Sequence, residues 1–313
     1  MTEQTPAGTD LETRIGATAE LSAAGGGTVA DIGVVGTRIR MPRIARTGNV
    51  GFWVGVVIMA IMVGAAIFAP LLTSHDPTQT DPSQALQPFS AEHPLGTDNL
   101  GRDMWSRLLY GARTDLTLAT IAVLVPFVIG VILGTLTGYF GGWLDAIVMR
   151  VADILSAFPF YILVIALVFV LGNGATSIFI AISIVSWVAY ARIVRAEALV
   201  LRDREFIQAC RAGGIGNGRI VIRHMVPNVI TQAIVYSMSD IVMNIGVIVT
   251  LSYFGLGIVP PTPDWGRMMS DGQQFLAGGY YSLTLVPAAA VVLASLGLSL
   301  LGDGLAHRLR ISR

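Results

Sequence analysis

The residue types that could carry out chemistry are few in this chain and lie far apart. A single cysteine, Cys210, excludes a disulfide framework and any metal site built from several cysteines. The four histidines, His75, His93, His224 and His307, show no HExxH pair or other metal-ligand spacing. All 20 basic residues are arginine, so the chain lacks the lysine of a Walker A phosphate loop. We therefore expect no catalytic residue set, no metal site, no cofactor and no ATP hydrolysis by that route.

Two carboxylates stand inside or beside long apolar runs. Asp153 lies one turn from Arg150, which favours an i, i+3 ion pair over a proton or ion relay. Asp240 has no basic residue three or four positions away, and Asn244 follows one turn later. We consider Asp240 and Asn244 candidates for the wall of a translocation path. A hydrogen bond across helices is an equally open alternative for Asp240.

The most basic stretch is RDREFIQACRAGGIGNGRIVIRHMVPN, residues 202–228. Over 203–213 the helical period places Phe206, Ala209, Cys210 and Gly213 on one side, opposite Arg204, Gln208 and Arg211. Small residues on the apolar side permit close approach of another surface. Glycines from Gly213 onward stop the helix, and Pro227 begins the next element. The pattern favours a helix that docks on a protein partner, with a lipid-bound interfacial helix or a solvated loop as alternatives.

These residues are set among long apolar runs. The chain is 53% hydrophobic and 13% charged, whereas a soluble domain has roughly a quarter of its residues charged. Six runs approach the about 20 residues that cross a bilayer as a helix, near 51–72, 116–138, 146–171, 175–191, 229–255 and 283–302. Only GNGA separates the third from the fourth, which predicts a tight hairpin. The spacing of Gly130, Gly134 and Gly138 predicts a close-packed helix face.

The arginines beside these runs predict the orientation. With the N-terminus in the cytoplasm, 16 of the 20 lie inside, and Arg102, Arg107, Arg113 and Arg267 lie outside. The expected fold is an all-α integral membrane protein with six transmembrane helices, N-in and C-in. We expect a disordered tail with a basic end over 1–45, the first span and an outer segment over 46–114, and a five-span core over 115–313. The basic loop 192–228 then faces the cytoplasm, and a second outer segment covers 256–282.

Several stretches resemble one known family, the binding-protein-dependent ABC permeases. Its EAA loop reads E-A-A-x-x-x-G and ends in I-x-L-P; the matching positions here are Gln208, Ala209, Cys210 and Gly214, then His224, Val226 and Pro227. The sequence departs from the motif by Gln for Glu, by Cys for the second Ala, and by His and Val in the ending. HPLGTDNLGRDMWSRLLYGAR (93–113), GYFGGWLDAIVMRVADILSAFP (138–159), LSYFGLGIVPPTPDWGRMM (251–269) and LLGDGLAHRL (300–309) resemble the C-type subunit of dipeptide, oligopeptide and nickel importers. The resemblance covers about 45–313.

The resemblance implies a non-catalytic permease subunit of a type I ABC importer in the bacterial inner membrane, surrounded by membrane lipid. Its expected partners are a second, homologous permease, two ATP-binding ATPase subunits on the cytoplasmic face, and an extracytoplasmic substrate-binding protein. The expected cargo is a di- or oligopeptide, with nickel or glutathione as the alternative. No nucleic acid is expected. A stand-alone secondary transporter is less favoured because the six runs do not form two matched halves. An intramembrane enzyme is less favoured because the runs contain no histidine.

The resemblance also assigns roles to residues. The EAA helix becomes a cytoplasmic coupling helix, so its candidate ATPase contacts are Arg204, Phe206, Gln208, Ala209, Cys210, Arg211, Gly214 and Pro227. In the outer motifs, Asp98, Arg102 and Asp103 can pair with one another, while Trp265 suits a membrane interface. These four residues are candidates for contact with the binding protein, and a purely structural turn is the alternative for Trp265.

Overall fold

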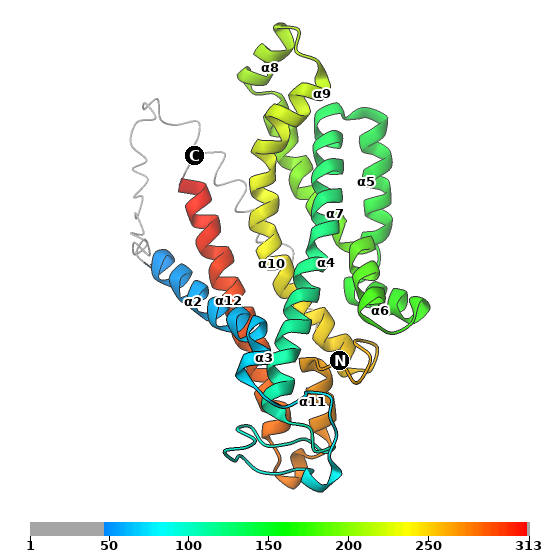
Figure 1. The fold of residues 1–313 in the computed structure, drawn as a ribbon. Helices are drawn as coiled ribbons and strands as arrows, with labels where there is room; N and C mark the ends of the chain where they lie inside the picture. Colours follow the sequence, from blue (N-terminus) through cyan, green and yellow to red (C-terminus); the bar gives the residue numbers. More distant parts are fainter. Residues whose placement is uncertain (1–46, 312–313) are drawn as a thin grey trace, which may run out of the picture. The chain divides into compact units, whose positions relative to one another are not determined.

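The computed structural model describes residues 47–311, so the expected tail over 1–45 lies outside the described residues. The described part is almost entirely helical (Figure 1). Its helices are α2 (Thr47–Ile67), α3 (Ala69–Leu72), α4 (Met104–Phe140), α5 (Gly142–Ser156), α6 (Phe160–Leu171), α7 (Ala175–Arg202), α8 (Glu205–Ala212), α9 (Asn217–Ile220), α10 (Val226–Tyr253), α11 (Trp265–Gln273) and α12 (Ser282–Ile311). Short 3₁₀ turns cover Pro82–Gln84 and Leu276–Gly278, and a π-turn covers Val221–Met225.

Five helices between residues 47 and 311 are long and apolar enough to cross a membrane. They cover Val50–Ile67, Met104–Phe140, Ala175–Arg202, Asn217–Tyr253 and Ser282–Leu309. They confirm the first, second, fourth, fifth and sixth of the predicted spans. The predicted hairpin is also present, since only 172–174 separate α6 from α7 and the two helices pack together.

The predicted third span is not one helix. α5 ends at Ser156, α6 begins at Phe160, and the pair is bent by 87°, so a continuous helix over 146–171 is wrong. Pro159 stands at the break. It has no N–H to bond back into α5, and its ring disfavours helical geometry at the preceding Phe158. The two apolar halves pass the length and composition test only when taken together, so the pair is either a broken span, which would be the sixth, or a re-entrant loop.

α4 and α7 pack against each other along much of their length. A Cβ atom placed on Gly134 would lie 2.6 Å from the carbonyl oxygen of Ala191, and one on Gly138 would lie 2.6 Å from Cβ of Ala198. Real Cβ atoms do not approach so closely, so the backbones touch only because these positions are glycine. The predicted small-residue face is therefore confirmed, and it holds α4 against α7.

The remaining helices surround this pair. α2 packs on α12, and α10 packs on α4, α7, α11 and α12. Large apolar side chains on α2 and α6 remain exposed, among them Trp53, Ile61, Phe169 and Val170. In a membrane protein such faces contact lipid or another subunit, because neither leaves apolar surface in water.

The segments predicted to lie on opposite sides of the membrane lie at opposite ends of the bundle. Figure 1 shows α8 and α9 at one end of α10, and α11 beyond the other end. The two predicted outer segments meet each other: Arg102 Nη2 lies 3.1 Å from Asp271 Oδ2, and the backbone N–H of Trp265 donates to Asp115. This separation is what the predicted topology requires.

Candidate functional site

The basic segment folds into α8, and Gly214 ends this helix. Gly214 has φ +75°, in the left-handed region that favours glycine. Its N–H donates to the carbonyl oxygen of Arg211 at 3.0 Å, and the N–H of Ile215 donates to that of Cys210 at 3.0 Å. These two bonds form a Schellman motif, which satisfies carbonyls that the helix end would leave free. The predicted stop at the glycines is confirmed.

One side of α8 is fastened to the rest of the chain. Ile207 is fully buried, and Cys210 is partly buried against the same core. Phe206, Gln208 and Ala209 are exposed, with Phe206 at 44%. The predicted apolar face was therefore partly wrong, because it left out Ile207, the residue that anchors the helix. The exposed surface available to a partner centres on Phe206 and Ala209.

Arg211 is exposed and also contacts the end of α4, so its predicted contact with an ATPase stays a prediction. Its guanidinium lies 4.8 Å from the centre of the Tyr139 ring, and Nε donates to the Tyr139 hydroxyl at 3.4 Å. That hydroxyl donates to Asn217 Oδ1 at 2.9 Å. Tyr139 lies in the last turn of α4, so α8, α9 and the end of α4 are joined through one aromatic ring. Arg204, at the N-cap of α8, stays exposed.

Pro227 lies in the first turn of α10. The π-turn over 221–225 joins α9 to this helix without a break, so Asn217–Tyr253 forms one long rod. Proline cannot donate the regular backbone bond of a helix, and a widened turn before it accommodates the missing donor. Pro227 was predicted to begin the next element. In the structure it lies inside a continuous helix that starts at α9 and runs on through α10.

Asp240 lies in the middle of the bundle beside a cavity of about 380 Å³. The wall comes from the bent α5–α6 junction, α7 and α10, and includes Arg192 and Met243. Oδ2 of Asp240 accepts a hydrogen bond of 2.9 Å from the Tyr190 hydroxyl. Tyr190 in turn meets Tyr236 edge to face, with ring centres 4.8 Å apart. Both interpretations of Asp240 are therefore compatible: it bonds across helices and it borders a cavity.

Asn244 and Asp153 differ from Asp240. Asn244 is fully buried, is not part of that cavity wall, and has no hydrogen-bond partner for either amide atom among residues 47–311. Asp153 was predicted to pair with Arg150, but its partner is Arg192, with Nη2 2.9 Å from Oδ1. The correction follows from the packing of α5 against α7, which sequence spacing cannot reveal.

The outer segments are held by a buried charge network. Asp98 Oδ2 lies 2.7 Å from Arg102 Nε and 3.3 Å from Arg107 Nη1. Asp271, on α11, meets Arg102 at 3.1 Å and Arg267 at 2.9 Å. The predicted pairing of Asp98 with Arg102 is confirmed, and both side chains are turned inward. The network ties the loop before α4 to α11.

Trp265 is fully buried, so its predicted place at a membrane interface is wrong. Its backbone N–H donates to Asp115 Oδ2 at 2.9 Å, and its indole N–H donates to the Leu108 carbonyl at 3.1 Å. Gly111 leaves room for the indole, since a Cβ there would lie 3.1 Å from it. The neighbouring Asp264 caps α11 by accepting from the Arg267 N–H at 2.9 Å, and burial raises the pKa of its carboxyl.

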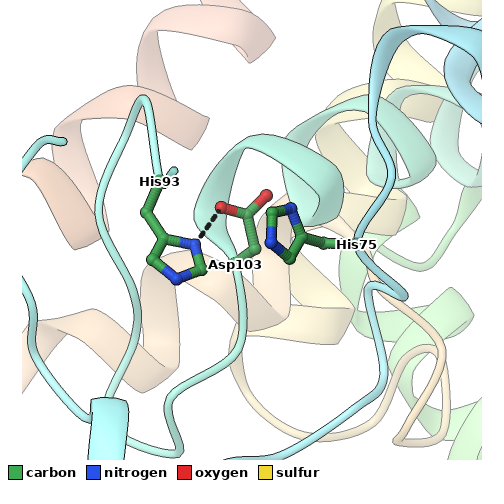
Figure 2. Close-up of side chains that lie close together, drawn as sticks. All are labelled: His75, His93 and Asp103. Atoms are coloured by element: carbon green, nitrogen blue, oxygen red, sulfur yellow. Dashed lines mark hydrogen bonds and ion pairs between the residues drawn. The ribbon is translucent and has the colours of Figure 1, made fainter. Parts of the chain in front are cut away.

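Asp103 belongs to a different cluster, with two histidines (Figure 2). His93 Nδ1 lies 2.9 Å from Asp103 Oδ1, and the His75 and His93 ring centres are 4.9 Å apart. The prediction that these histidines lie apart is therefore wrong. Their separations in sequence match no metal-site motif, because long loops, not a single helix, bring them together. Direct contact of Asp98, Arg102, Asp103 and Trp265 with a binding protein stays a prediction, and all four side chains are buried in the chain.

Comparison with known proteins agrees with this arrangement. Residues 130–311 match the family described as the inner membrane component of binding-protein-dependent transport systems. Residues 48–88 match the N-terminal transmembrane domain of oligopeptide transport permease C.

Individual relatives cover most of the chain. A dipeptide transport system permease of Alkalihalophilus pseudofirmus is 41% identical over 80% of this chain and 83% of its own length. An oligopeptide transport system permease of Bacillus subtilis is 38% identical over 80% and 82%. A glutathione transport system permease of Pectobacterium atrosepticum is 37% identical over 78% and 81%. The chain is a multi-pass inner membrane protein that belongs to the permease family of binding-protein-dependent transport systems, with the N-terminal membrane domain of the C-type subunit.

Proposed function

We propose that this chain forms part of the membrane path of an ATP-driven importer that takes up short peptides. Relatives named as dipeptide and oligopeptide permeases support the cargo class. The glutathione permease supports a second, weaker candidate of related chemistry, since glutathione is itself a small peptide. A homologous permease, two ATPase subunits that hydrolyse the ATP, and an extracytoplasmic binding protein complete the complex.

The observation that carries the coupling role is the two-sided build of α8. Its exposed side offers Phe206 and Ala209 to a partner, while Ile207 holds the opposite side in the core. Arg211 adds a link to Tyr139 at the end of α4. A displacement of the exposed side of α8 would therefore also move α4 and α10, because packed side chains attach α8 to α4 and α8 leads through α9 into the continuous helix that contains α10. We place the ATPase groove over this exposed side.

Cross-linking tests this placement. Ala209 is a better probe position than the native Cys210, because Cys210 is partly buried. In a Cys210→Ser background, Ala209→Cys is expected to form disulfides with cysteines in the ATPase groove. His307→Cys, on an exposed position of α12, serves as the control and is expected to remain uncrosslinked. Equal cross-linking from both positions, or none from Ala209→Cys at any groove position, removes the coupling role.

We further propose that the cavity beside Asp240 is part of the passage. Its wall combines apolar side chains with a carboxylate and the Arg192 guanidinium, a mixture suited to a peptide with charged termini and varied side chains. Asp240→Asn keeps an acceptor for the Tyr190 hydroxyl but removes the charge. We expect slower peptide uptake with ATP hydrolysis largely kept, and Asp303→Asn, an exposed control, should transport normally. Normal uptake by Asp240→Asn excludes a role for this charge.

The cargo itself is tested with the complete reconstituted complex. Dipeptides, oligopeptides, nickel and glutathione are offered in turn with the binding protein, and stimulated ATP hydrolysis is measured. Stimulation by peptides supports the proposal, whereas stimulation by nickel alone overturns it. At the outer end, we propose that Asp98, Arg102, Asp103 and Trp265 shape the surface that meets the binding protein, because their side chains are engaged inside the chain.

A further inference from the structure

Three side chains of the outer segment converge although they lie far apart in the sequence. His75 follows α3, His93 lies in the loop before α4, and Asp103 is the N-cap of α4. One ligand atom from each lies within 4.8 Å of the others. Figure 2 shows the Asp103 carboxylate between the two imidazole rings. His93 and Asp103 are buried and His75 is half-buried, so the cluster is shielded but reachable from one side.

The orientation of His93 is fixed by a second contact. Its Nε2 lies 2.9 Å from Oε1 of Gln84. The amide of Gln84 can accept from Nε2–H of His93, which leaves Nδ1 with a lone pair on the side of the Asp103 carboxylate. Nδ1 lies 2.9 Å from the Asp103 oxygen, and in this tautomer a metal ion can be held by both atoms.

Asp103 is fixed in a similar way. Its Oδ2 accepts hydrogen bonds of 2.7 Å from both the backbone N–H and the hydroxyl of Ser106. Its Oδ1 is therefore the oxygen that faces the histidines. A histidine whose far nitrogen donates to a carbonyl, beside a carboxylate held by hydrogen bonds, is the usual surrounding of metal ligands in proteins.

We propose that His75, His93 and Asp103 bind a divalent transition metal ion of the zinc type. Two imidazoles and one carboxylate suit such ions, whereas Mg²⁺ and Ca²⁺ prefer sites made entirely of oxygen. Ligand atoms around a tetrahedral zinc lie about 3.3 Å apart, given bonds of about 2.0 Å. The three ligand atoms lie within 4.8 Å of one another, so the proposed site requires the half-buried His75 side chain to rotate toward the other two ligands when the ion binds. A water molecule completes the set.

The ion would be structural. It joins three parts of the chain: the residues after α3, the loop before α4 and the N-terminus of α4. Without the ion, these parts are connected along the chain by a loop of about thirty residues that contains little helix. Gln84 acts as the positioning residue for His93. The site lies at the end of the bundle away from α8, so its ligands do not overlap the proposed coupling surface.

Metal content of the assembled transporter tests the proposal. The complex is purified through a tag that contains no histidine, stripped with a chelator, loaded with Zn²⁺ and desalted, and its zinc is measured by mass spectrometry. We expect wild type to retain one more zinc per copy of this chain than His75→Ala. His75→Phe, which keeps a ring against His93 without a ligand atom, should match His75→Ala and guards against misfolding. His307→Ala removes an exposed histidine elsewhere and should retain the wild-type amount.

Two further measurements separate metal binding from a simple ion pair. Gln84→Leu should bind one zinc with about 10–100-fold weaker affinity, the usual effect of removing a partner of a ligating histidine. Excess Mg²⁺ should not displace the zinc. Equal zinc in wild type, His75→Ala and His75→Phe, or displacement by Mg²⁺, overturns the proposal and leaves a direct hydrogen bond between His93 and Asp103.

Discussion

Replacement of Gly214 by alanine should loosen the end of α8 by a calculable amount. A Cβ at Gly214 meets no atom within 4 Å, so packing contributes nothing to the change. The cost comes from the backbone, because φ +75° costs a residue with a side chain roughly 1–2 kcal/mol. Such a cost changes the population of the opened helix end by about 5–30-fold. The amides of Gly214 and Ile215, which donate the two capping bonds, should exchange faster by that factor.

Hydrogen–deuterium exchange of the segment 205–216 in the assembled complex measures this effect. Gly213→Ala is the matched control, because Gly213 has φ −76°, which suits alanine, and the nearest atom to its new Cβ would be the Ala209 carbonyl oxygen at 3.3 Å. That variant should exchange at the wild-type rate or more slowly, since alanine reduces the freedom of the unfolded chain. Gly214→Asn should fall between wild type and Gly214→Ala, because asparagine tolerates the left-handed region. Similar exchange in Gly213→Ala and Gly214→Ala would refute the capping argument.

Three other outcomes follow from the packing and charges. Gly134→Ala should destabilise the detergent-purified complex by about 1–3 kcal/mol, seen as a lower unfolding temperature, whereas Gly64→Ala, where a Cβ meets nothing within 4 Å, should not. Asp271→Ala should cost about 1–3 kcal/mol, because it leaves the buried guanidinium groups of Arg102 and Arg107 to share Asp98, and the exposed Asp303→Ala should be neutral in the same melting assay. Burial raises the pKa of the Asp264 carboxyl, so the contribution of this group to stability is complete below its ordinary pKa of 3.8 and falls as pH rises. Melts across pH should therefore show a smaller loss of stability with rising pH in Asp264→Asn than in wild type.

The membrane-spanning helices were largely predictable because lipid imposes length and composition on them directly. The apolar runs located five spans, and the arginines indicated which ends belong together. The break at Pro159 also had a local signal, since proline removes a backbone donor and restricts Phe158. The apolar residues on both sides of Pro159 together have the length of one span, and this length favoured a continuous helix in spite of the proline. α4 extends well before the predicted 116 because its polar first turns are capped by Asp103, outside the apolar run.

The contacts of the site were less predictable because they join distant parts of the chain. Arg192 replaces Arg150 as the partner of Asp153 only because α5 lies against α7. Trp265 is buried because Gly111, more than 150 positions earlier, leaves space for its ring. His75 and His93 meet through loops whose course no periodicity describes. Sequence spacing reports neighbours on one helix, and these pairs do not share one.

α4 is longer than the membrane is thick. Its 37 residues span about 55 Å, whereas the hydrocarbon layer is about 30 Å thick. Tyr139 near one end contacts Arg211 of α8, and Asp103 at the other end contacts His93 of the outer segment. α4 therefore extends beyond the hydrocarbon layer, with one end beside α8 and the other in the outer segment. A rigid tilt of α4 by about 5° about one end would displace its other end by about 5 Å, so a helix of this length would need no relay of side chains through the apolar middle to connect the two ends.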